Sequence, residues 1–215
     1  ARWQPTPPAY MDAVEPHWGK IRTLVMDSSA QFKPKAPFPF STDKSSDFYR
    51  EAKETYDVGN KISKDLLAME KTKSTTIPEE SAIATFWDCN PYATVTQGHM
   101  MFAKKKNTPD AHWINIAKIA CKTAKTDFNK TVFVYTKTSI GVFESFISCW
   151  DQKFKTNVVR PETYINQYID ENWKPQLQTP PFPEYTSGHS VLSACSAEIL
   201  TAIFGDNFAY VDDSE

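Results

Sequence analysis

The sequence lacks a strong net charge, long apolar runs and closely spaced cysteines, which are the features of several common protein classes. Its 215 residues carry a formal net charge of −2, and no apolar run approaches the roughly 18 residues that a membrane helix needs. The four cysteines are widely spaced, without a CxxC pair or a histidine at zinc-finger spacing: Cys89, Cys121, Cys149 and Cys195. A zinc site, a disulfide framework, membrane insertion and a nucleic-acid partner are therefore not indicated. The cysteines are predicted to be core residues.

What the chain does contain is the composition of a globular protein. Hydrophobic residues make up 40% and aromatic residues 13%, which is enough for a substantial core. Fifteen prolines against six glycines predict stiff connections. The prolines gather at 3–10, 32–40 and 173–185, where extended arms or loops are expected. The first residue, Ala1, is compatible with a processed, periplasmic or secreted protein and equally with an expressed fragment.

Helical patterns of apolar residues occupy most of the sequence outside the proline-rich segments. No segment shows the alternation of apolar and polar residues that is typical of a strand. Amphipathic spacing predicts helices over 46–69, 108–127 and 131–154, although the β-branched start of the last segment would also suit a strand. A fourth helix is predicted to end at Trp87, with Thr76 and Glu79 as a capping box and Pro78 in the first turn. We expect one all-α domain over 1–215, with N-terminal helices and loops in 1–106 and the core from 107.

The segment TSGH opens the apolar run near the C-terminus and predicts an anion site. Ser187 is a good N-cap residue, Gly188 lets a ligand approach the backbone, and the following amides carry the positive end of a helix dipole. His189 could exchange a proton with a bound group. An ordinary helix cap beside a surface histidine is the alternative.

Upstream, the segment KFKTNVVRPE supplies two cations that suit an oxyanion. Lys153 offers a point charge and Arg160 a planar fork of donors, while Lys155 is expected to be solvated. A solvated basic patch is the alternative for the whole segment.

Together the two segments resemble the vanadium-dependent haloperoxidases and the type 2 phosphatidic acid phosphatase superfamily. The motif K-x6-R-P is matched by Lys153, Arg160 and Pro161, and the motif P-S-G-H by 186–189, with Thr186 in place of proline. The flanking WDQK at 150–153, the PPFPEY segment and the segments 81–92 and 109–117 also resemble soluble bacterial members of chloroperoxidase type.

The resemblance implies an all-helical bundle that holds vanadate, or phosphate in the phosphatases. It assigns anion binding to Lys153, Arg160, Ser187 and the Gly188 amide, acid–base chemistry to His189, and the lining of the site to Trp150 and Phe182. Vanadate would be the cofactor of a haloperoxidase, with hydrogen peroxide and halide as substrates. A phosphatase would instead take a phosphate ester and need no cofactor.

A third motif of this superfamily, S-R-x5-H, supplies the histidine that ligates vanadium, and no such motif follows His189 here. We therefore expect a C-terminally incomplete chain that catalyses little alone, completed by a separate segment or by a homo-oligomer. The other histidines, His17, His99 and His112, are expected to be structural or surface residues. Three functions stay open: a haloperoxidase, an acid phosphatase and a noncatalytic helical binding protein.

Overall fold

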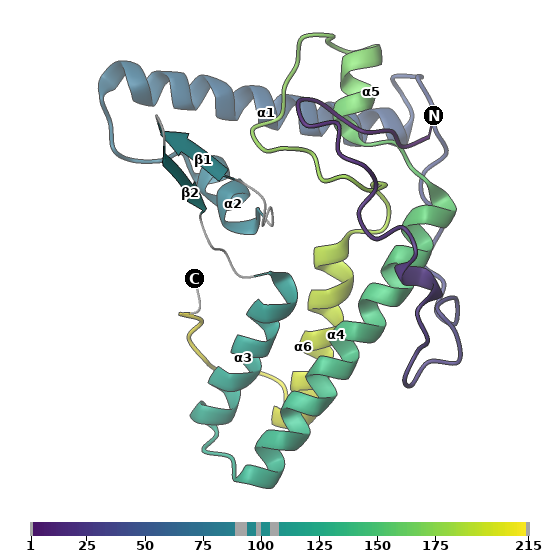
Figure 1. Ribbon diagram of the computed structural model, residues 1–215. Coiled ribbons are helices and arrows are strands. Elements are labelled where there is room, and N and C mark those ends of the chain that lie inside the picture. Colours follow the sequence, from purple (N-terminus) through teal and green to yellow (C-terminus); the bar gives the residue numbers. More distant parts are fainter. Residues whose placement is uncertain (1, 89–93, 98–99, 104–107, 214–215) are drawn as a thin grey trace. The chain divides into compact units, whose positions relative to one another are not determined.

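The computed structural model describes residues 2–88, 94–97, 100–103 and 108–213. Their backbones form two compact units, which are described separately (Figure 1). The first unit takes its residues from 1–14, 34–88 and 156–185. The second takes its residues from 15–33, 89–155 and 186–215. Each unit is therefore assembled from segments that are distant in the sequence.

The first unit contains the helices α1 (Asp47–Thr72), α2 (Glu79–Trp87) and α5 (Pro161–Tyr168). The Ser46 hydroxyl accepts the Tyr49 N–H at 3.2 Å and so caps α1. Helix α1 packs against both α2 and α5. A core forms from Ala52, Val159 and Tyr164, with Phe48, Tyr49 and Ile169 packed around it.

The second unit contains the 3-10 helix η1 (Trp18–Lys20) and three α-helices, α3 (Pro109–Thr123), α4 (Phe128–Thr156, of which Thr156 falls in the first unit) and α6 (Gly188–Phe204). A short antiparallel hairpin of β1 (Thr94–Gln97) and β2 (Met100–Ala103) precedes α3. In Figure 1, α6 runs beside α4, with α3 also next to it. Their core consists of Ile116, Ala117, Cys121, Val134 and Leu200.

The helical class expected from the sequence is confirmed, and the ambiguous segment 131–154 lies within α4. The predicted capping box at Thr76 is wrong: α2 begins at Glu79, and its N-cap is Pro78, whose side chain has no group that can accept a backbone N–H. The hairpin and α5 were not predicted. No described helix has both the length and the apolar character that crossing a membrane requires.

Candidate functional site

The start of α6 has the geometry that the TSGH segment predicts. Ser187 has extended backbone angles, and its hydroxyl oxygen accepts the Ser190 N–H at 3.2 Å. Ser187 is therefore the N-cap, and its own hydroxyl proton remains available for donation. The N–H groups of Gly188 and His189 lie in the first turn, where a helix has no internal acceptors for them. This end of α6 thus offers donors and a positive dipole to an anion.

An aromatic cluster supports the first turn of α6. Trp150 is buried and contacts Trp18 and Phe146, with ring centroids 5.1 and 5.2 Å apart. A Cβ on Gly188 would lie 3.5 Å from Trp150 Cζ3. Trp150 therefore packs directly against the backbone at the helix start, so the indole limits how that backbone can move.

The Lys153 side chain is buried near the end of α4, with 1% of the residue exposed. Its Nζ atom lies 5.8 Å from the centroid of the Trp150 ring. A cation is favoured in the last turn of a helix, where the dipole is negative. Lys155, by contrast, is exposed and pairs with Asp151 at 2.6 Å, which confirms it as a solvated charge. Of these two lysines, Lys153 is the one whose burial suits it to anion binding.

His189 is electrostatically coupled to Lys153. Burial lowers the pKa of His189 below its ordinary value, and the Lys153 charge lowers it further. The imidazole is therefore neutral at neutral pH and can accept a proton. A bound anion would act in the opposite direction and raise this pKa.

Arg160 lies in the first unit, immediately before α5. Because the residue before a proline avoids helical angles, Pro161 holds Arg160 in an extended conformation with φ −73° and ψ 147°. Its Nη1 lies 2.6 Å from Glu184 Oε2, and its guanidinium carbon lies 5.6 Å from the Phe182 ring centroid. Burial lowers the pKa of Arg160, while the charges of Glu184 and Glu162 act to raise it. The Nε–H of Arg160 is buried without a hydrogen-bond partner among the described residues.

The predicted site residues thus fall into two groups. The second unit brings together Trp150, Lys153, Ser187, Gly188 and His189. The first unit brings together Arg160 and Phe182. Glu184 was missed from the sequence, although it stands two positions after Phe182, a spacing at which side chains in extended chain share a side.

The other histidines and the cysteines do not extend either group. His112 is buried and its Nε2 lies 2.5 Å from Asp212 Oδ2, whereas His17 is exposed beside η1. His99 and Cys89 lie outside the described residues. Three free cysteines, one of them half-buried, are Cys121, Cys149 and Cys195. Within 2–88, 94–97, 100–103 and 108–213, no group of three His, Cys, Asp or Glu side chains could hold a metal ion.

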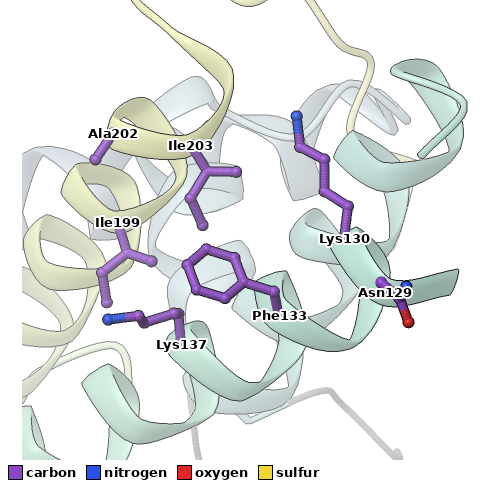
Figure 2. A pocket seen from close by; sticks show the side chains of 7 residues that line it. All are labelled: Asn129, Lys130, Phe133, Lys137, Ile199, Ala202 and Ile203. Carbon is purple, nitrogen blue, oxygen red and sulfur yellow. The ribbon is translucent and has the colours of Figure 1, made fainter. Parts of the chain in front are cut away.

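A separate pocket of about 680 Å³ opens between α4 and α6. Figure 2 shows the Phe133 ring facing Ile199 and Ile203, with Lys130 and Lys137 at the edges. Lys153 lies 16 residues beyond Lys137 along α4, which corresponds to about 24 Å of helix. The pocket is therefore distinct from the residues of the two motifs.

Comparisons with known proteins give the following matches. A family model described as the VCPO second helical-bundle domain matches residues 133–214. A solved structure titled "Crystal structure of the first bacterial vanadium dependant iodoperoxidase" is 55% identical, with a TM-score of 0.85. The match covers 100% of this chain and 48% of that one, so the chain spans about half the length of its neighbour. No curated protein matches.

Proposed function

Because the chain belongs to the vanadium haloperoxidase superfamily, we propose that it supplies the oxyanion-binding residues of a vanadate-dependent haloperoxidase. The similarity over the whole chain to an iodoperoxidase carries this proposal, and it makes iodide the first halide to test. Hydrogen peroxide is the oxidant. Oxidation of a halide by hydrogen peroxide consumes a proton and gives hypohalous acid and water.

The chemistry of the proposed donors suits an oxyanion such as vanadate. The fit is supported by the buried Nε–H of Arg160, which lacks a partner among the described residues, and by the buried Lys153 ammonium. Arg160, Lys153, the Ser187 hydroxyl and the Gly188 N–H are the proposed donors. That all four bind one anion is inferred from the two motifs. When bound, vanadate would activate hydrogen peroxide toward the halide.

His189 is the proposed acid–base residue. Its lowered pKa keeps an imidazole nitrogen free of a proton at neutral pH, so the ring can take a proton from an incoming hydroxyl group and later return it. Trp150 and Phe182 are proposed to exclude water beside the donors, since each packs against a residue of this set. Exclusion of water strengthens the interaction of the cations with the anion.

The test uses a purified polypeptide that contains these residues and the third-motif histidine that the resemblance implies, supplied with orthovanadate, hydrogen peroxide and iodide. We expect iodide oxidation that depends on vanadate and is reduced strongly by Arg160→Ala. Hydrolysis of a phosphate monoester, inhibited by vanadate and without halide oxidation, would contradict the proposal and support an acid phosphatase. Oxyanion binding without either reaction would support a noncatalytic protein.

A further inference from the structure

We propose that Glu184 is a positioning residue for Arg160 that also disfavours doubly charged oxyanions. This inference rests on the proposed function, because it concerns the anion that Arg160 binds. The pair is short, at 2.6 Å between Arg160 Nη1 and Glu184 Oε2. Phe182 lies on the guanidinium as well, 5.6 Å from ring centroid to guanidinium carbon. Two side chains of the same loop therefore hold one arginine.

The backbone fixes the Glu184 carboxylate in this place. The Glu184 N–H donates to the Val158 carbonyl at 3.1 Å, and the Thr156 hydroxyl donates to the Tyr185 carbonyl at 3.1 Å. These two bonds attach the loop to the segment that leads into Arg160. The carboxylate is consequently placed by backbone register rather than by a flexible surface contact.

The arrangement leaves Arg160 only part of its donors and charge for an anion. Nη1 forms the ion pair with Glu184, whereas the buried Nε–H has no hydrogen-bond partner among the described residues and is the proposed donor to a ligand. An oxyanion at Nε is attracted by the guanidinium and repelled by the nearby carboxylate. The repulsion grows in proportion to the charge of the anion. Compared with a site that lacks this carboxylate, Glu184 therefore penalises a doubly charged oxyanion more than a singly charged one.

Solvent limits how strongly the Glu184 charge acts on a bound anion. The Glu184 side chain is 42% exposed and the Arg160 side chain 13% exposed, so water reaches part of the glutamate, although the Oε2 atom that faces Arg160 is buried. A purely structural ion pair would give the same geometry, but it would not discriminate between oxyanions by charge. The variant Glu184→Gln distinguishes a structural ion pair from selection of oxyanions by charge. Its amide oxygen can accept from Arg160, but the negative charge is lost.

The experiment measures calorimetric binding of sulfate and of perrhenate, both tetrahedral, with two and one negative charges. We expect Glu184→Gln to tighten perrhenate binding by about threefold and sulfate binding by about tenfold, since the effect on the free energy doubles with the charge. Glu184→Ala also loses the acceptor for Nη1 and should gain less than Glu184→Gln. The control is Glu171→Gln, which changes the net charge equally at an exposed position and should alter neither affinity.

The outcomes separate the two proposals. If the wild-type chain binds both anions and Glu184→Gln binds them equally or more weakly, the role of Glu184 is wrong and the proposed function is untouched. Sulfate binding by Glu184→Gln alone would support discrimination by charge and count against a functional site in the wild-type chain. No binding by any variant that unfolds cooperatively on heating would contradict both.

Discussion

Trp150 packs against the first residue of α6, since a Cβ on Gly188 would lie 3.5 Å from Trp150 Cζ3, an ordinary van der Waals separation. Gly188→Ala is therefore expected to fold, with thermal stability equal to or above that of the wild type, because alanine is the better helix former. The added methyl group beside the first-turn N–H should weaken sulfate binding by about tenfold, roughly the value of one charge-assisted hydrogen bond. Calorimetry and thermal unfolding measure the two effects. Unchanged sulfate affinity would remove Gly188 from the site.

Arg160→Lys tests the planar fork rather than the charge. Lysine keeps a positive charge but cannot pair with Glu184 and donate to an anion in the same fixed geometry. We expect oxyanion affinity to fall by about 10- to 100-fold, and further in Arg160→Ala. The matched control is Arg50→Lys on α1, where the arginine is exposed and pairs with Asp47. Equal affinities of Arg160→Lys and wild type would show that charge alone is sufficient.

His189→Gln should reduce turnover more than oxyanion binding, because the residue is proposed to move a proton rather than to hold the anion.

In the wild-type chain, NMR titration of the His189 imidazole should give a pKa below the ordinary value of 6.5, and sulfate should raise this pKa. The unfolded chain takes up this proton more readily than the folded one. Stability is therefore lost as pH falls from the unfolded pKa through the folded pKa. A His189 pKa that sulfate leaves unmoved would separate this histidine from the anion.

Glu144 holds the backbone of the 15–33 segment to α4. Its carboxylate accepts the N–H groups of Leu24 at 2.5 Å and Met26 at 2.9 Å. Burial acts to raise the pKa of Glu144, but the backbone N–H groups outweigh burial and lower it. Glu144 therefore stabilises the fold above its ordinary pKa, and this contribution disappears as pH falls through the folded pKa.

Glu144→Gln should lower the free energy of unfolding by about 1–3 kcal/mol at neutral pH, since one amide oxygen replaces two carboxylate oxygens. Denaturant titration at several pH values measures the loss, and it should shrink in acid. Glu198→Gln on α6 is the exposed control. A loss that stays constant down to low pH would mean that the carboxylate charge is not responsible.

Gly141 permits a close approach of α4 and α6. A Cβ at this position would lie 2.2 Å from Ile199 Cδ1 and 3.1 Å from Cys195 Sγ, and the Cys195 thiol already contacts the Gly141 carbonyl at 3.5 Å. Gly141→Ala should destabilise by about 1–3 kcal/mol through overpacking. Ile199→Ala in the same chain should restore part of the loss. Stability unaffected by Gly141→Ala would mean that the two helices can separate at no cost.

Local chemistry made part of this fold and site predictable from the sequence. Ser187 caps α6 because its side chain acts within three residues, and Pro161 sets the backbone of Arg160 because its ring contacts the preceding residue. The start of α2 was predicted wrongly because Thr76 and Glu79 fit a capping box, yet Pro78 takes the N-cap position. Proline has no side-chain group that can cap a helix, so the predicted capping box does not form at this end of α2.

Contacts between distant segments were not predictable in the same way. Glu184 pairs with Arg160 because a loop 24 residues later in the sequence lies against the start of α5. Trp18 contacts Trp150 although it stands 132 positions earlier in the sequence. No periodicity or capping rule places such partners, because they depend on the packing of whole elements. The sequence therefore indicated the candidate donors, and the structure added the residues that hold them.

The most direct measurement is orthovanadate binding by calorimetry to the 215-residue chain and to its Lys153→Ala and Arg160→Ala variants. The two substitutions lie in different units, so each tests whether its motif serves the anion. We predict that the wild type binds vanadate at a single site and that each variant weakens it by at least about tenfold. Vanadate binding that both variants retain in full, or no binding by a folded wild-type chain, would contradict the oxyanion site.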